Sequence, residues 1–175
     1  DEIYIITGDR DAGDTYSYGL MKSLDGGLTF NTTGLSFNIT GFYKGNRVLI
    51  DDDNTNIIIV ATNNGIYRST DAAFSFTNTF SSINITDIEF HPTNTNIIYG
   101  ASYGNTSIYK SVDNGINWSQ AGNGLPSTNS VVRACVAVTP DNPSVVYALF
   151  GDNSNGFYGV YKSNDLGNNW TQQSN

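Results

Sequence analysis

One short phrase occurs four times in this chain and constrains its fold more than any other feature. It begins at Ser23, Ser69, Ser111 and Ser163 and follows the pattern Ser-x-Asp-x-Gly-x-(Thr/Ser/Asn)-aromatic. Its aspartates recur at intervals of 46, 42 and 52 residues. A period of this length is typical of chains that stack copies of one small structural unit. We therefore expect a repeat architecture with four units.

The phrase has the composition of a tight turn between two strands, and we call the four copies Ser-Asp turns. Aspartate accepts hydrogen bonds from backbone N–H groups of its own turn, and glycine adopts a positive φ without steric cost. The second copy has Ala73 where glycine is expected, so we predict a looser turn there. The conserved positions of the pattern are held by Ser23, Asp25, Gly27 and Phe30; Ser69, Asp71, Ala73 and Phe76; Ser111, Asp113, Gly115 and Trp118; and Ser163, Asp165, Gly167 and Trp170.

Strand-like stretches lie between the turns, and they predict an all-β chain. The third repeat shows them most clearly, at 85–90, 97–101, 107–110 and 118–120. Aromatic residues reach 13% and glycines number 18, a composition that suits short strands between Gly and Asn turns. No segment of helical period is present. We predict one domain over 1–175 with antiparallel four-stranded units at about 1–34, 35–80, 81–125 and 126–175, the first without its inner strand.

The repeated phrase resembles the Asp-box, or BNR repeat, of sialidases, sortilin-like (VPS10) receptor domains and xyloglucan-degrading glycosidases. Proteins of this superfamily are β-propellers, and the box lies between the third and fourth strands of a blade, on the face away from the active site. The resemblance implies a β-propeller in which these aspartates are structural. Propellers close with about four to eight blades, and those that carry Asp-boxes have six or more. The resemblance therefore implies that four repeats are part of a larger ring, completed by further blades or by a second copy of the chain.

Charge and composition exclude several classes of function. The formal net charge is −8 with only eight Lys and Arg, whereas nucleic-acid binding needs clustered basic side chains. No apolar run approaches the length of a membrane span. The chain has one histidine, His91, and one cysteine, Cys135, which argues against zinc sites and histidine-dependent triads. Cys135 lies in an apolar run, so we expect a buried, inert thiol.

The loop 7–19 carries three closely spaced carboxylates, Asp9, Asp11 and Asp14. Three hard oxygen ligands could converge on Ca²⁺, which is the cofactor we consider. The same aspartates are candidates for the carboxylate of a glycoside hydrolase, which normally works in a pair. A solvated acidic loop without a ligand is the third interpretation, and the sequence leaves all three open.

Aromatic and basic residues near the same predicted loops are candidates for ligand binding. Tyrosine and phenylalanine can stack on sugar rings, although they can equally fill the contacts between blades. Arg47 and Arg133 could hold a carboxylate as sialidases do, but the Arg-Ile-Pro motif of sialidases is missing. The candidate ligand-binding residues are Arg10, Tyr16, Tyr18, Arg47, Tyr103, Arg133, Phe157 and Tyr158.

These observations favour a non-catalytic extracellular recognition module that binds a glycan or a protein. Part of a glycoside hydrolase and a structural scaffold of a large adhesin are the alternatives. The loop 7–17 also resembles a phrase in large secreted, sortilin-like propeller proteins of Bacteroidetes, many of them similar to type 9 secretion cargo. That resemblance implies an extracellular or cell-surface location.

Overall fold

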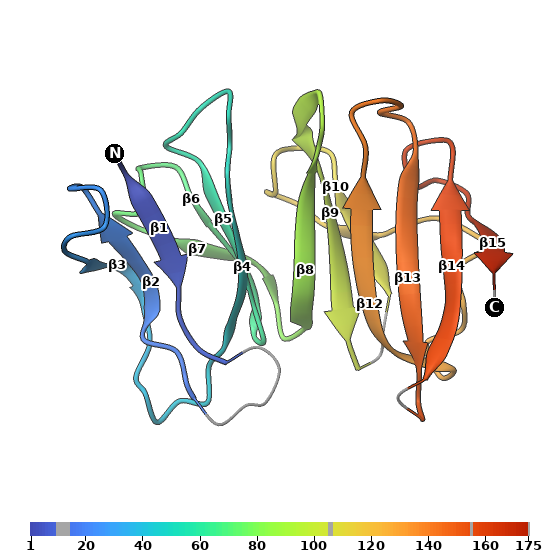
Figure 1. Cartoon of the computed structure of the whole chain (residues 1–175), viewed down its shortest axis with the longest axis horizontal. Coiled ribbons are helices and arrows are strands. Elements are labelled where there is room, and N and C mark those ends of the chain that lie inside the picture. Colours follow the sequence, from blue (N-terminus) through green and yellow to red (C-terminus); the bar gives the residue numbers. More distant parts are fainter. Residues whose placement is uncertain (10–14, 105–106, 155, 175) are drawn as a thin grey trace. The chain divides into compact units, whose positions relative to one another are not determined.

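The computed structural model describes residues 1–9, 15–104, 107–154 and 156–174 (Figure 1). The described residues form fifteen strands and no helix, which confirms the all-β prediction. No segment among them forms a helix long and apolar enough to cross a membrane. The chain divides into two compact units, Asp1–Ile83 and Asn84–Asn175, and each is described by itself.

The first unit contains two antiparallel sheets. One has the order β1-β2-β3 and the other the order β4-β5-β6-β7, so each strand pairs with its neighbour in sequence. Short turns suit this antiparallel meander, because only antiparallel neighbours can be joined by tight hairpins. The bounds are β1 (Ile3–Ile6), β2 (Gly19–Ser23), β3 (Asn31–Ser36), β4 (Gly45–Ile50), β5 (Ile58–Thr62), β6 (Gly65–Ser69) and β7 (Thr77–Ser81).

The second unit repeats the same arrangement twice. Its strands form one eight-stranded sheet, in which β8 to β11 pair in sequence order, β12 to β15 pair in sequence order, and the pair Arg133–Tyr103 joins β12 to β9. The bounds are β8 (Asn84–His91), β9 (Asn94–Tyr103), β10 (Ile108–Ser111), β11 (Ser119–Gln120), β12 (Val131–Val138), β13 (Val146–Asp152), β14 (Phe157–Ser163) and β15 (Thr171–Ser174).

Each unit has an apolar core between its two sets of consecutive strands, β1–β3 and β4–β7 in the first unit and β8–β11 and β12–β15 in the second. In the first unit, Leu20 and Leu35 pack against Ile58, Val60 and Ala73. In the second unit, the cluster contains the following buried residues from both sets of strands: Tyr99, Ala101, Ile108, Ala121, Val131, Ala134, Val136, Val146, Ala148, Phe150, Tyr161 and Trp170. Because side chains alternate across a strand, only every second residue of each strand enters the core between them.

The four Ser-Asp turns share one hydrogen-bond pattern. In the first turn the Ser23 hydroxyl donates to Asp25 Oδ1 at 2.8 Å, and the Thr29 backbone N–H donates to the same oxygen at 2.9 Å. The Thr29 hydroxyl donates to Asp25 Oδ2 at 2.6 Å, and the Gly27 N–H donates to Ser23 Oγ at 2.8 Å. Equivalent bonds are present in the second, third and fourth turns.

Two sequence expectations are wrong in detail. The second turn is not looser, because Ala72 and Ala73 adopt φ values of 54° and 73° and Ala73 N–H still donates to Ser69 Oγ at 3.0 Å. The turn's hydrogen bonds therefore outweigh the cost of a left-handed alanine. Cys135 is half-buried rather than buried, because β12 turns this side chain away from the core.

Candidate functional site

The loops that carry the predicted site residues lie at one end of each unit's strands, and we call this end the loop face. In the first unit β1 ends and β2 begins there, while β2 and β6 run away from it to end at Ser23 and Ser69. The Ser-Asp turns therefore lie at the opposite end, which we call the turn face. The repeated Ser-Asp turns therefore lie at one end of the strands, and loops that differ from blade to blade lie at the other end.

Backbone hydrogen bonds hold two loops of the first unit's loop face together. The Ser17 N–H donates to the Tyr43 carbonyl at 2.9 Å, and the Gly45 N–H donates to the Thr7 carbonyl at 3.1 Å. The hydroxyls of Thr7 and Ser17 lie 3.1 Å apart, so one donates to the other. These bonds fix the ends of the loop between β1 and β2 against the loop between β3 and β4.

Three aromatic side chains stand out on this loop face. The rings of Tyr16 and Phe42 meet edge to face, with centroids 4.9 Å apart. Phe42 is 65% exposed and Tyr18 is 55% exposed. Phe42 also has a φ of 59°, which is unusual for a bulky residue and is one of the features that recur at functional sites. The arrangement presents flat apolar surface to solvent.

Phe42 was not among the residues predicted from the sequence. Its neighbour Tyr43 stacks on Phe37 with centroids 4.4 Å apart, so the two consecutive aromatics have different roles. Gly41 immediately before them marks a turn, and the combination of a turn glycine and an aromatic pair is the signal that could have found the site. The sequence does not indicate the positive φ of Phe42, and so it does not indicate that Phe42 rather than Tyr43 is exposed.

The acidic loop is only partly within the described part of the chain. The Asp9 N–H donates to the Thr15 carbonyl at 2.8 Å, and Asp9 is half-buried. Arg10, Asp11 and Asp14 lie outside the described residues, so the predicted calcium ligands stay a prediction. Among the residues that are described, no three His, Cys, Asp or Glu side chains gather in a way that could hold a metal ion.

In the second unit, three of the predicted residues are exposed at the loop face. Tyr103, at the end of β9, pairs with Arg133 of β12, and both are exposed. Phe157 begins β14 and is also exposed, whereas Tyr158 is half-buried and packs against the core of the unit. A role of Tyr158 in ligand binding stays a prediction. Arg47 lies half-buried on β4 of the first unit.

Asp87 on β8 is a buried carboxylate that the sequence analysis did not single out. It is 5% exposed, and its Oδ2 accepts a hydrogen bond from the Val136 N–H at 3.1 Å. Thr86 beside it donates to the carbonyls of Ala101 and Ala134 at 3.2 Å. Both side chains therefore connect β8 to β12, and Thr86 also bonds to β9.

The aspartates of the Ser-Asp turns are saturated with hydrogen bonds. Bonds from the Thr29 hydroxyl and N–H and from Ser23 lower the pKa of Asp25 to about 2. Equivalent bonds lower the pKa of Asp71 and of Asp165 to about 2. At Asp113 partial burial opposes the shift, but the bonds from Asn117 still lower the pKa. Carboxylates held ionised in this way are poor proton donors, which fits a structural role.

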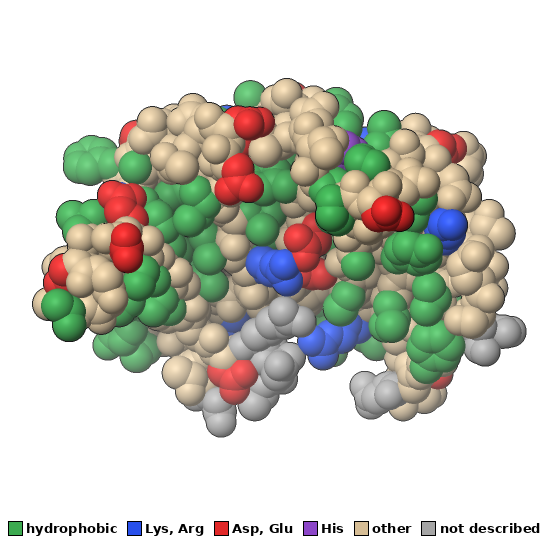
Figure 2. All heavy atoms as spheres, turned by 45° about the horizontal axis from the view of Figure 1, so that its top comes forward, with side chains coloured by type: hydrophobic (Ala, Val, Ile, Leu, Met, Phe, Trp, Pro, Cys, Tyr) green, Lys and Arg blue, Asp and Glu red, His purple; other side chains and the backbone are tan. Residues whose placement is uncertain are grey.

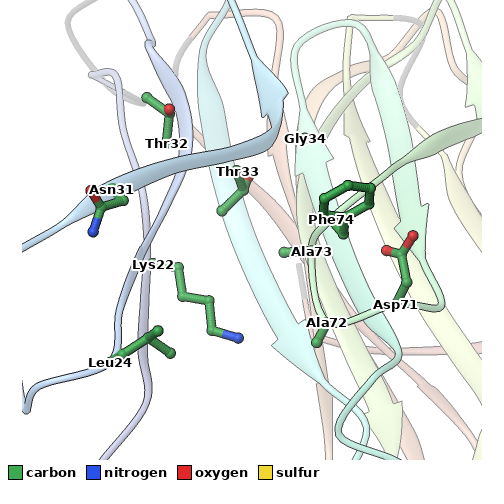
Figure 3. A pocket seen from close by; sticks show the side chains of 10 residues that line it. All are labelled: Lys22, Leu24, Asn31, Thr32, Thr33, Gly34, Asp71, Ala72, Ala73 and Phe74. Atoms are coloured by element: carbon green, nitrogen blue, oxygen red, sulfur yellow. The ribbon is translucent and has the colours of Figure 1, made fainter.

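A cavity of about 580 Å³ lies on the turn face of the first unit. Figure 3 shows Lys22 and Leu24 on one side of it and the second Ser-Asp turn, with Phe74, on the other. The Lys22 ammonium pairs with Glu2 at 3.1 Å and lies 5.1 Å from the centre of the Tyr4 ring. The residues that line the cavity are Lys22, Leu24, Asn31, Thr32, Thr33, Gly34, Asp71, Ala72, Ala73 and Phe74.

The surface is poor in positive charge. On the side shown in Figure 2, backbone and uncharged polar side chains make up much of the surface, with few Lys and Arg side chains among them. This agrees with the net charge of −8 and suits neutral ligands better than anionic ones.

No protein-family model and no curated protein matches the chain. Solved structures do match it. An ancestral GH74 enzyme superposes with a TM-score of 0.75 and 23% identity over 98% of this chain and 24% of its own. The GH74 enzyme of Niastella koreensis superposes with a TM-score of 0.72 and 24% identity over 98% of this chain and 27% of its own.

The GH74 xyloglucanase from Xanthomonas campestris superposes with a TM-score of 0.71 and 17% identity, over 97% of this chain and 28% of that one. The chain has a β-propeller fold. This confirms the prediction of antiparallel propeller blades, and each set of consecutive strands can be called a blade. The chain spans about a quarter of the length of these three structures. The superpositions establish the fold, whereas sequence identities this low do not establish the activity.

Proposed function

We propose that the chain is a carbohydrate-recognition part of an extracellular β-propeller protein, with its ligand at the loop face of the first unit. The observation that carries the proposal is the aromatic surface of exposed Tyr18 and Phe42, with half-buried Tyr16 against Phe42, on loops held together by hydrogen bonds. Flat exposed rings suit the apolar faces of sugar rings, and their fixed backbone limits the entropy lost on binding. The resemblance to GH74 propellers, one named a xyloglucanase, supports xyloglucan as the first ligand to test.

The four Ser-Asp turns support membership of the Asp-box superfamily. We propose that they are Asp-boxes, because serine, aspartate and the following Thr, Ser or Asn form one repeated set of hydrogen bonds. In this proposal the turns stabilise each blade and take no part in ligand binding. A sortilin-like receptor, which binds protein, is the competing member of the same superfamily.

The binding proposal is tested with two matched phenylalanines. Phe42 and Phe74 belong to the same unit, and both are exposed, but Phe42 is on the loop face and Phe74 is on the turn face. Binding of xyloglucan oligosaccharide is measured by isothermal titration calorimetry for the wild type, Phe42→Ala and Phe74→Ala. We expect Phe42→Ala to weaken binding about fivefold, since stacking contacts contribute roughly 1 kcal/mol, and Phe74→Ala to leave it unchanged. Equal effects of the two substitutions would contradict the proposal.

Glycoside hydrolysis is the second candidate function, favoured by the GH74 structures and by Asp9 beside the aromatic loops. Hydrolysis requires a pair of carboxylates around the scissile bond. Release of reducing ends from xyloglucan by the chain, abolished in Asp9→Asn with binding retained, would establish catalysis. Binding without release supports the recognition module.

A further inference from the structure

The exposed position of the Phe42 ring depends on a backbone conformation that needs support. Phe42 has a φ of 59°, in the left-handed region that residues other than glycine rarely adopt. A bulky residue stays in this region only where the surrounding structure holds its backbone in place. The groups that bond to the peptide groups around Phe42 therefore decide where its ring lies.

Asn63 supplies these bonds from a different part of the unit. It lies in the two-residue connection between β5 and β6. Its Nδ2 donates to the Phe42 carbonyl at 2.8 Å, and its Oδ1 accepts a bond from the Lys44 N–H at 2.9 Å. Its own backbone N–H donates to the Lys44 carbonyl at 3.1 Å. One residue therefore fixes the peptide groups before and after Tyr43.

The connection that carries Asn63 is itself well held. The Thr62 hydroxyl donates to the Gly65 carbonyl at 2.9 Å, and the Asn64 N–H donates to Thr62 Oγ1 at 3.0 Å. Thr62 and Gly65 are buried, and so is every residue of β5. A side chain on paired, buried strands keeps its position better than one on a loop. Asn63 is therefore a firm support for the loop between β3 and β4.

The bonds from Asn63 act where two consecutive rings have different surroundings. The Tyr43 ring stacks on Phe37 with centroids 4.4 Å apart. The Phe42 ring instead meets Tyr16 edge to face at 4.9 Å and is 65% exposed. Rotation of the peptide group between Phe42 and Tyr43 would move the Phe42 ring away from Tyr16. Asn63 bonds to the carbonyl of that peptide group, so it opposes this rotation.

We propose that Asn63 is the positioning residue of the carbohydrate site, holding Phe42 in the left-handed conformation that places its ring beside Tyr16. The ring is then in its binding position before a ligand arrives, so less conformational freedom is lost on binding. Asn63 acts through Phe42 and needs no contact with the sugar. The identity of the ligand rests on the proposed function, whereas the positioning of the ring can be tested without a ligand.

Two neighbouring asparagines provide a matched pair of variants. In Asn63→Asp the carboxylate has the shape of the amide and still accepts a bond from the Lys44 N–H, but it has no proton to donate to the Phe42 carbonyl. Asn64→Asp adds the same charge to the same connection. The Asn64 side chain donates to the Tyr67 hydroxyl at 3.3 Å and makes no recorded bond to the loop, so it is the control.

The first readout uses the nuclear Overhauser effect (NOE) in the ligand-free chain. A left-handed residue gives a strong NOE between its own amide and α protons, and the ring contact gives an NOE between Tyr16 and Phe42. At neutral pH we expect both signals in the wild type and in Asn64→Asp, and neither in Asn63→Asp. Both should return in Asn63→Asp as the pH falls through about 4, because the protonated carboxyl can donate again.

A further variant removes the two side-chain bonds without adding charge. Asn63→Ala should lose both NOE signals at every pH. Retention of the signals in Asn63→Asp at neutral pH or in Asn63→Ala, or an equal loss in Asn64→Asp, would overturn the proposal.

The second readout is binding of xyloglucan oligosaccharide, measured by calorimetry. At neutral pH we expect Asn63→Asp to weaken binding about fivefold, as Phe42→Ala does, and the double variant to lose no more than either alone. Binding by Asn63→Asp should recover at the lower pH, whereas the affinities of the wild type and of Asn64→Asp change little.

The two readouts separate the two claims. A wild type that binds and an Asn63→Asp variant that binds equally well at neutral pH would overturn the positioning role and leave the carbohydrate site in place. A wild type that does not bind would contradict the proposed function, and the NOE signals would still decide whether Asn63 positions Phe42.

Discussion

The Tyr99 hydroxyl is fully buried in the second unit's core and has no hydrogen-bond partner among the described residues. Burial raises the pKa of Tyr99 to about 12. A buried polar group without a hydrogen-bond partner lowers the free energy of unfolding, because it loses its bonds to water on folding. Removing the group therefore removes this penalty. We expect Tyr99→Phe to keep or raise the free energy of unfolding, by up to about 1 kcal/mol, in urea denaturation. Tyr99→Ala should lower it by about 3 kcal/mol through the cavity it leaves, and a loss of that size in Tyr99→Phe would show that the hydroxyl is bonded.

The turn aspartates give the chain a defined acid sensitivity. Asp25, Asp71 and Asp165 have pKa values of about 2 in the fold, below the ordinary value of 3.8. A depressed folded pKa contributes stability that is present above pH 4 and is lost as the pH falls towards 2. We expect the urea midpoint to fall steeply over this window and less steeply in Asp25→Asn. A variant with the wild-type pH slope would contradict the hydrogen-bond account.

Among elements, the second Ser-Asp turn is the one that departs from its pattern. Ala73 has a φ of 73°, where glycine is normally found and alanine is strained by about 1 kcal/mol. Ala73→Gly should therefore leave the melting temperature unchanged or raise it slightly. Ala137→Gly, in the middle of β12, is the contrasting variant and should lower stability by about 0.5–1 kcal/mol. A lower melting temperature in Ala73→Gly would show that the packing of the Ala73 methyl group in the core outweighs the strain of its φ.

The elements were also what the sequence predicted best. The Ser-Asp turns placed the ends of β2, β6, β10 and β14, because serine and aspartate bond within a few residues of each other. Local chemistry of this kind is readable from the sequence. Phe42 was missed because its left-handed φ is not indicated by the sequence, whereas the assignment of Tyr158 to ligand binding stays a prediction. The role of Asp87 could not be predicted because it depends on tertiary structure: its hydrogen-bond partner Val136 is 49 residues away in the sequence.

At the scale of the whole molecule, calcium binding stays a prediction that a melting curve can test. If Asp9, Asp11 and Asp14 share a Ca²⁺ ion, saturating CaCl₂ should raise the melting temperature through linkage, and EDTA should lower it. Asp9→Asn should remove the response and MgCl₂ should reproduce little of it. Identical curves in CaCl₂ and EDTA would contradict a calcium site in this loop.

We propose that the two ends of the blades have different roles, with ligand binding at the loop face and a structural role at the turn face. A titration of ¹⁵N-labelled chain with xyloglucan oligosaccharide, followed by backbone amide shifts, tests it most directly. We predict saturating shifts at Tyr16, Tyr18 and Phe42 and none at the turn-face cavity around Lys22 and Phe74. Shifts confined to the turn face, or no shifts at all, would contradict the account.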